Sequence, residues 1–106
     1  MSYTAEKLYQ VVDTLVGDGD LSDRLYFAGQ YLIRLNGHPD LSHHGEVAER
    51  ITRLINRLTG TEAVADEGQL RASVSAMATD ERQRIARALL QLYIDLISEA
   101  SVEGRH

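Results

Sequence analysis

The chain has 106 residues, of which 43% are hydrophobic and 25% are charged, and its formal net charge at pH 7 is -5. This length corresponds to one domain, the composition is that of a globular protein, and the acidic net charge argues against a general attraction to nucleic acid. The sequence contains no cysteine, which excludes disulfide bonds, a thiolate nucleophile and a zinc site built on sulfur.

The first segment, residues 4–16, has the apolar spacing of an amphipathic helix, and no secretory signal precedes it, so we expect a cytoplasmic protein. Its predicted core face comprises Ala5, Leu8, Val11, Val12, Leu15 and Val16. The following stretch, GDGDLSD at residues 17–23, looks like the start of a calcium loop. An EF-hand loop beginning at Asp18 would need glycine at its sixth position and glutamate at its twelfth, where Asp23 and Gly29 stand. We therefore predict that a left-handed Gly17 ends the first helix and that Asp20 or Ser22 caps the second.

The second predicted helix covers residues 21–36 and ends before Gly37 and Pro39. Its core face is expected to consist of Leu21, Leu25, Ala28, Leu32 and Leu35. Its other faces carry Tyr26, Phe27, Tyr31 and Ile33, so the helix is apolar nearly all round. A helix of this kind is usually central in a bundle or shared with a partner.

Residues 38–46 contain the densest group of potential metal ligands, including His38, His43, His44 and Glu46. Imidazole and carboxylate groups suit zinc or iron, but no established ligand spacing occurs here. We favour a polar loop that leads into a helix, with these four residues as a weak alternative metal site, and we expect no cofactor. No serine or second acid is placed to complete a catalytic constellation, so we do not expect an enzyme.

The third predicted helix, residues 45–59, carries Arg50, Arg53 and Arg57 along one flank. This stripe could bind phosphates, which makes a nucleic-acid-associated factor the alternative function. The connection from residue 37 to residue 44 is too long for a helix-turn-helix motif. Glu46 and Glu49 precede Arg50 and Arg53 by four residues and favour ion pairs within the helix, so nucleic acid is an unlikely partner. The expected core face is Val47, Ile51, Leu54, Ile55 and Leu58.

Residues 61–65 have little periodicity and are expected to form a flexible connection to a short helix, with Asp66 and Gln69 as its capping box. This helix aligns Leu70, Val74 and Met77. A fifth helix, residues 79–98, has one core face, Ile85, Leu89, Leu92 and Leu96, and a second apolar face, Ala86, Leu90, Tyr93, Ile94 and Ile97.

The pattern predicts an all-α protein: a compact, single-domain bundle of four to five helices over residues 1–100, followed by a disordered tail at 101–106. Helices two and five carry more apolar surface than so small a domain can enclose, and such surface usually marks a contact site. Neither helix has a polar face rich in lysine or arginine, so we do not expect membrane binding. We therefore predict a non-catalytic interaction or regulatory module that forms a homodimer, or docks on or inhibits a larger protein. The predicted contact residues are Tyr26, Phe27, Tyr31, Leu90, Tyr93, Ile94 and Ile97.

Overall fold

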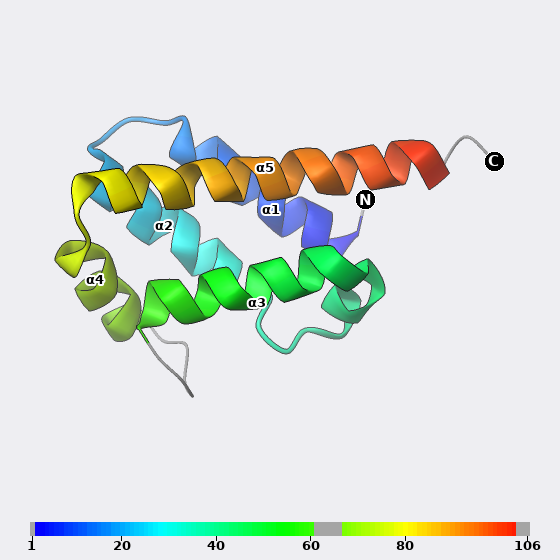
Figure 1. The fold of residues 1–106 in the computed structure, drawn as a ribbon, viewed down its shortest axis with the longest axis horizontal. Coiled ribbons are helices and arrows are strands. Elements are labelled where there is room, and N and C mark those ends of the chain that lie inside the picture. Colours follow the sequence, from blue (N-terminus) through cyan, green and yellow to red (C-terminus); the bar gives the residue numbers. More distant parts are fainter. Residues whose placement is uncertain (1, 61–66, 104–106) are drawn as a thin grey trace.

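The computed structural model describes residues 2–60 and 67–103, and Figure 1 shows their arrangement. The elements are α1 (Tyr3–Leu15), α2 (Leu21–Ile33), a 3₁₀ helix η1 (Pro39–His44), α3 (Gly45–Thr59), α4 (Glu67–Ala76) and α5 (Thr79–Glu103). The described part of the chain is all-α and forms one compact bundle, which confirms the predicted fold class. Within it, no helix combines the length and the apolar character needed to cross a lipid bilayer.

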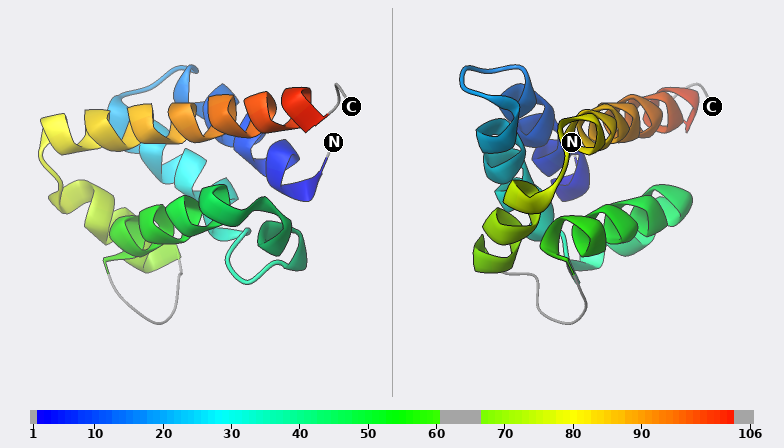
Figure 2. Two further views of the ribbon diagram at one scale, coloured as in Figure 1. Left: turned by 45° about the vertical axis from the view of Figure 1, so that its right-hand side comes forward. Right: turned by 60° about the vertical axis from the view of Figure 1, so that its left-hand side comes forward.

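The long helix α5 is the element along which the others are arranged (Figure 1). It runs antiparallel to α1, with which it is in contact, and it also contacts α3 and α2. In the right-hand view of Figure 2, α3 and α5 lie on one side of the bundle, and α1 and α2 lie on the other. Helix α4 closes one end by packing on α2 and α3.

The core consists largely of the residues that the helical spacing selects. Leu25, Leu32 and Leu35 on α2 and the turn after it are fully buried, as are Ile51 and Leu58 on α3 and Leu89 and Leu92 on α5. Leu70 and Val74 of α4, and Met77 directly after it, are also buried as predicted. The prediction was wrong for Val16, which is 74% exposed because α1 ends one residue earlier and leaves it in the turn. Leu21 and Leu54 are only partly buried.

The acidic stretch at residues 17–23 lies at the end of α1 and the start of α2, as predicted. The Asp20 carboxylate accepts a hydrogen bond of 2.9 Å from the Asp23 N–H and thereby caps α2. The left-handed glycine is Gly19, with φ 101°, and the prediction of Gly17 was wrong. The end of α1 is instead closed by Arg24, which donates to the Leu15 carbonyl at 2.6 Å and to the Gly19 carbonyl at 3.0 Å.

Other helix ends agree in part. Helix α3 has the predicted bounds and stops at left-handed Gly60, with φ 82°. Helix α2 ends at Ile33, three residues early, because the N–H groups of Leu35 and Asn36 bond to carbonyls only three residues back. Helix α5 continues to Glu103, beyond the expected end near Ser98. The predicted connection at 61–65, the cap at Asp66 and the end of the tail lie outside the described residues.

Candidate protein interaction surface

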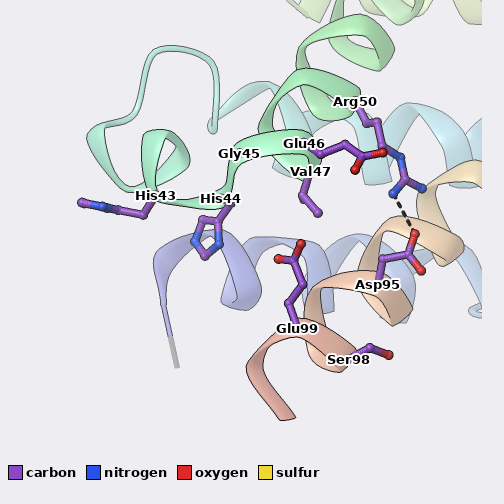
Figure 3. Close-up of a pocket in the computed structure, with 9 residues that line it drawn as sticks. All are labelled: His43, His44, Gly45, Glu46, Val47, Arg50, Asp95, Ser98 and Glu99. Carbon is purple, nitrogen blue, oxygen red and sulfur yellow. Dashed lines mark hydrogen bonds and ion pairs between the residues drawn. The ribbon is translucent and has the colours of Figure 1, made fainter. Parts of the chain in front are cut away.

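The histidine-rich stretch borders a cleft of about 640 Å³ between the start of α3 and the C-terminal part of α5. Figure 3 shows His43, His44 and Glu46 on one wall, and Asp95 and Glu99 of α5 on the other. His38 is not among the residues that line this cleft, and its ring stacks on Tyr3 with centroids 3.9 Å apart. The four predicted metal-site residues are therefore not brought together.

Several of these side chains bond to helix ends. The Asp40 carboxylate accepts a hydrogen bond of 2.9 Å from the Thr4 N–H in the first turn of α1, and the His44 ring lies 3.4 Å from the same oxygen. The ring of His38 accepts a hydrogen bond of 3.1 Å from the Asp40 N–H. Across residues 2–60 and 67–103, no three His, Cys, Asp or Glu side chains are grouped so that they could hold a metal ion. The stretch thus ties η1 to the start of α1.

The hydrogen bond from the Thr4 N–H lowers the pKa of Asp40 from its ordinary value of 3.8 to about 2. Because the folded state favours the ionised carboxylate, this contribution to stability is complete above the ordinary pKa and is lost as the pH falls towards 2. We expect Asp40→Ala to lower the free energy of unfolding by about 1–2 kcal/mol at pH 7.

The difference between native protein and the Asp40→Ala variant should shrink as the pH falls from 3.8 towards 2. Urea denaturation at a series of pH values would measure it. Asp18→Ala is the matched control, because Asp18 is exposed and forms no ion pair with a described residue. A difference that is independent of pH would contradict the role of the Asp40 charge.

The arginines of α3 are paired with carboxylates. Arg50 bonds to Asp95 of α5 at 2.7 Å, and Arg57 bonds to Glu81 of α5 at 2.7 Å through its Nε. The prediction that Arg50 pairs with Glu46 was therefore wrong. The predicted pair of Arg53 with Glu49 is present, with 3.8 Å between the charged atoms. The bond from Arg50, with a further one from Gln91, lowers the pKa of Asp95. Two of the three arginines thus join α3 to α5.

Cationic side chains from α1, from α4 and from the end of α2 itself lie close to the tyrosine rings of α2. The Arg71 guanidinium lies 3.9 Å from the centre of the Tyr26 ring, and Lys7 and Arg34 lie 5.8 Å and 5.5 Å from that of Tyr31. Tyr26 and Tyr31 are partly buried against the core, whereas Phe27 is 49% exposed. The three residues therefore offer less free apolar surface than their sequence indicates.

The second apolar face of α5 is exposed. Leu90, Ile94 and Ile97 have exposed fractions of 43%, 45% and 46%, and their spacing of four and three residues places them in one row. Beside this row the partly buried Tyr93 meets Tyr9 of α1, which is 52% exposed, with ring centroids 6.2 Å apart. We call Tyr9, Leu90, Tyr93, Ile94 and Ile97 the α1–α5 apolar surface.

The predicted contact residues do not form one patch. Lys7 reaches Tyr31 of α2, whereas Tyr9, two positions later, reaches Tyr93 of α5. Since residues two apart point to different sides of a helix, the α2 aromatics and the α5 row lie on different flanks of α1. Tyr9 was not among the predicted contact residues. Its spacing of three and seven residues to Val12 and Val16 marks a second apolar row on α1 and could have identified it.

Four of the six exposed large apolar side chains in the described residues belong to the α1–α5 apolar surface: Tyr9, Leu90, Ile94 and Ile97. Of the other two, Phe27 lies on α2 and Val16 caps the end of α1. Compared with known proteins, the chain matches no family model, no curated protein and no solved structure.

Proposed function

We propose that the protein is a non-catalytic protein-interaction module of the cytoplasm that binds through the α1–α5 apolar surface. Its partner is a second copy of the chain or a larger protein that it regulates or inhibits. The observation that carries the proposal is the row of Leu90, Ile94 and Ile97, each nearly half exposed on a helix whose opposite side lies in the core. Aliphatic side chains grouped in this way are typical of contact sites.

The energetics support an interaction at this surface. Burial of apolar surface contributes about 25 cal/mol per Å², so covering the exposed half of each of these side chains would contribute about 1 kcal/mol apiece. The aromatic Tyr9 adds a rigid side chain of the type enriched at interfaces. The covered aromatic rings of α2 have less to gain, so we place the contact on α5 and α1.

The alternative, binding of nucleic acid by the arginines of α3, is less favoured because Arg50 and Arg57 already bond to carboxylates of α5. A phosphate ligand would have to compete with these pairs. Retention on DNA or RNA that falls steeply with salt would favour the alternative, because phosphate contacts release counterions and apolar contacts do not.

We expect Ile94→Asp to convert an associated protein into a folded single chain, because the charge would be desolvated in the contact but remains in water on the free surface. Sedimentation velocity would give the mass, and circular dichroism would give the helix content. Phe27→Asp is the matched control, since Phe27 has a similar exposure on a different flank, and it should leave the mass unchanged. A native protein of single-chain mass whose Ile94→Asp variant unfolds would contradict the proposal, because Ile94 would then serve the core alone.

A further inference from the structure

The α1–α5 apolar surface is bordered by charges of opposite sign. On α5, Arg87 precedes Leu90 by three residues and Ile94 by seven, so it extends their row. It lies away from Tyr93, from which it is turned by about 120° according to the helical period. On α1, Glu6 and Asp13 are the helical neighbours of Tyr9 at three and four residues. All three charged side chains are exposed.

These border charges form no ion pair within the described part of the chain, unlike five arginines elsewhere on it. Arg50, Arg53, Arg57, Arg71 and Arg84 all form ion pairs. Across the described residues, no ion pair involves Arg87, Glu6 or Asp13. The charges next to the apolar surface are therefore free to pair with another molecule.

The basic and acidic borders are also matched in position along the helices. Arg87 lies six residues before Tyr93, and Asp13 lies four residues after Tyr9, on an antiparallel helix. At a rise of 1.5 Å per residue, the two side chains are displaced by about 9 Å and about 6 Å from the tyrosine pair, towards the same end of the bundle. They thus lie at nearly the same level, on opposite borders of the surface.

We propose that the occupant of this surface is a second copy of the chain, related by a two-fold axis that runs parallel to α5. This inference rests on the proposed function and names its partner. Such an axis places α5 of each copy over α1 of the other. It leaves the position of every residue along the helix direction unchanged, so residues at the same level face each other. The row of Leu90, Ile94 and Ile97 then covers Tyr9 of the second copy, and Arg87 faces Asp13 of that copy, once on each side.

The charges argue against the other symmetric arrangement. A two-fold axis across the helices would place α1 of each copy over α1 of the other in the antiparallel sense. Glu6 and Asp13 lie on opposite sides of Tyr9 along α1, so each would meet the other across the axis. Facing carboxylates repel one another, whereas the parallel axis brings opposite charges together.

The test is a charge reversal on each border, with the dimer dissociation constant measured by sedimentation equilibrium. Arg87→Asp and Asp13→Arg should each raise this constant about fivefold to tenfold, because each change replaces two attractive pairs by two repulsive ones. The double variant restores the pairs with exchanged signs and should return to within about twofold of the native value. Arg84→Asp is the control on the same helix, since Arg84 lies beside Asp80 and away from the apolar row, and it should have little effect.

The outcomes separate this inference from the proposed function. A native protein of single-chain mass would contradict the inference and self-association together. A dimer that Ile94→Asp dissociates, but that neither charge reversal weakens, would support the proposed function and overturn the arrangement. A double variant weaker than both single variants would likewise overturn the pairing of Arg87 with Asp13.

Discussion

Replacing Leu70 with alanine is expected to lower the free energy of unfolding by about 3 kcal/mol. Leu70 is fully buried on the short helix α4, as is Val74 of the same helix, and Met77 directly after it is also buried. It packs on the buried Gly29 of α2, where a methyl group added to the glycine Cα would lie 2.8 Å from a Leu70 methyl carbon. The variant leaves a cavity between α2 and α4 that neither backbone can fill.

The close approach of Gly29 to Leu70 gives this prediction an internal test. Alanine in a helix is normally more stable than glycine by about 1 kcal/mol, but at Gly29 the added methyl group has no room. In the Leu70→Ala background that room exists, so Gly29→Ala should be more favourable there by about 1–2 kcal/mol. Urea denaturation of the native protein, the two single variants and the double variant measures this coupling. The control is the same cycle with Val74→Ala in place of Leu70→Ala. If Gly29→Ala is coupled equally to Leu70→Ala and to Val74→Ala, the packing of Gly29 on Leu70 is contradicted.

The adjacent leucines Leu89 and Leu90 should respond very differently to the same substitution. Leu89 is fully buried, whereas Leu90 is 43% exposed. Aspartate at position 89 would carry a charge into the core at a cost of about 5 kcal/mol or more, which is comparable to the whole stability of a domain of this size. Aspartate at position 90 should cost only about 1–2 kcal/mol, from helix propensity and lost partial burial.

Circular dichroism during thermal unfolding would measure both leucine variants. We expect Leu89→Asp to be largely unfolded at 25 °C, and Leu90→Asp to keep the helix content of the native protein. Loss of structure in both variants would show that the second face of α5 is part of the core. That result would remove the basis of the interaction surface.

The sequence predicted correctly several features that depend on residues close to one another along the chain. The amphipathic α3 has both predicted bounds because its apolar spacing is regular and Gly60 supplies a left-handed terminus. Asp20 caps α2 because its partner, the N–H of Asp23, is three residues away. Leu70, Val74 and Met77 are buried as their spacing indicates.

Features that depend on distant residues were not predictable. Asp40 bonds to Thr4, 36 residues away, and Arg50 bonds to Asp95, 45 residues away, although Glu46 stood at the favoured spacing on the same helix. The 3₁₀ helix η1 was expected as a loop, since the five residues after Pro39 show no helical spacing of apolar side chains. The aromatic residues of α2 were predicted to be available for a partner. The cations next to two of these rings, Arg71 and Lys7, come from other helices and could not be identified from the sequence of α2.

The site was therefore predicted only in part. The spacing of Leu90, Ile94 and Ile97 identified the exposed row of α5, because a helix with two apolar faces has one more than a core contact requires. It did not identify Tyr9, which joins the surface through its contact with Tyr93. It also could not show that Arg87 and Asp13 border the same surface at one level, since this depends on the antiparallel packing of α1 and α5.

We expect the α1–α5 apolar surface to be covered by a second copy of the chain in solution. Sedimentation equilibrium of the native protein between about 1 and 100 μM, where moderate protein complexes form, tests it most directly. We predict a mass that rises with concentration to that of two chains. A mass of one chain throughout this range would contradict this expectation.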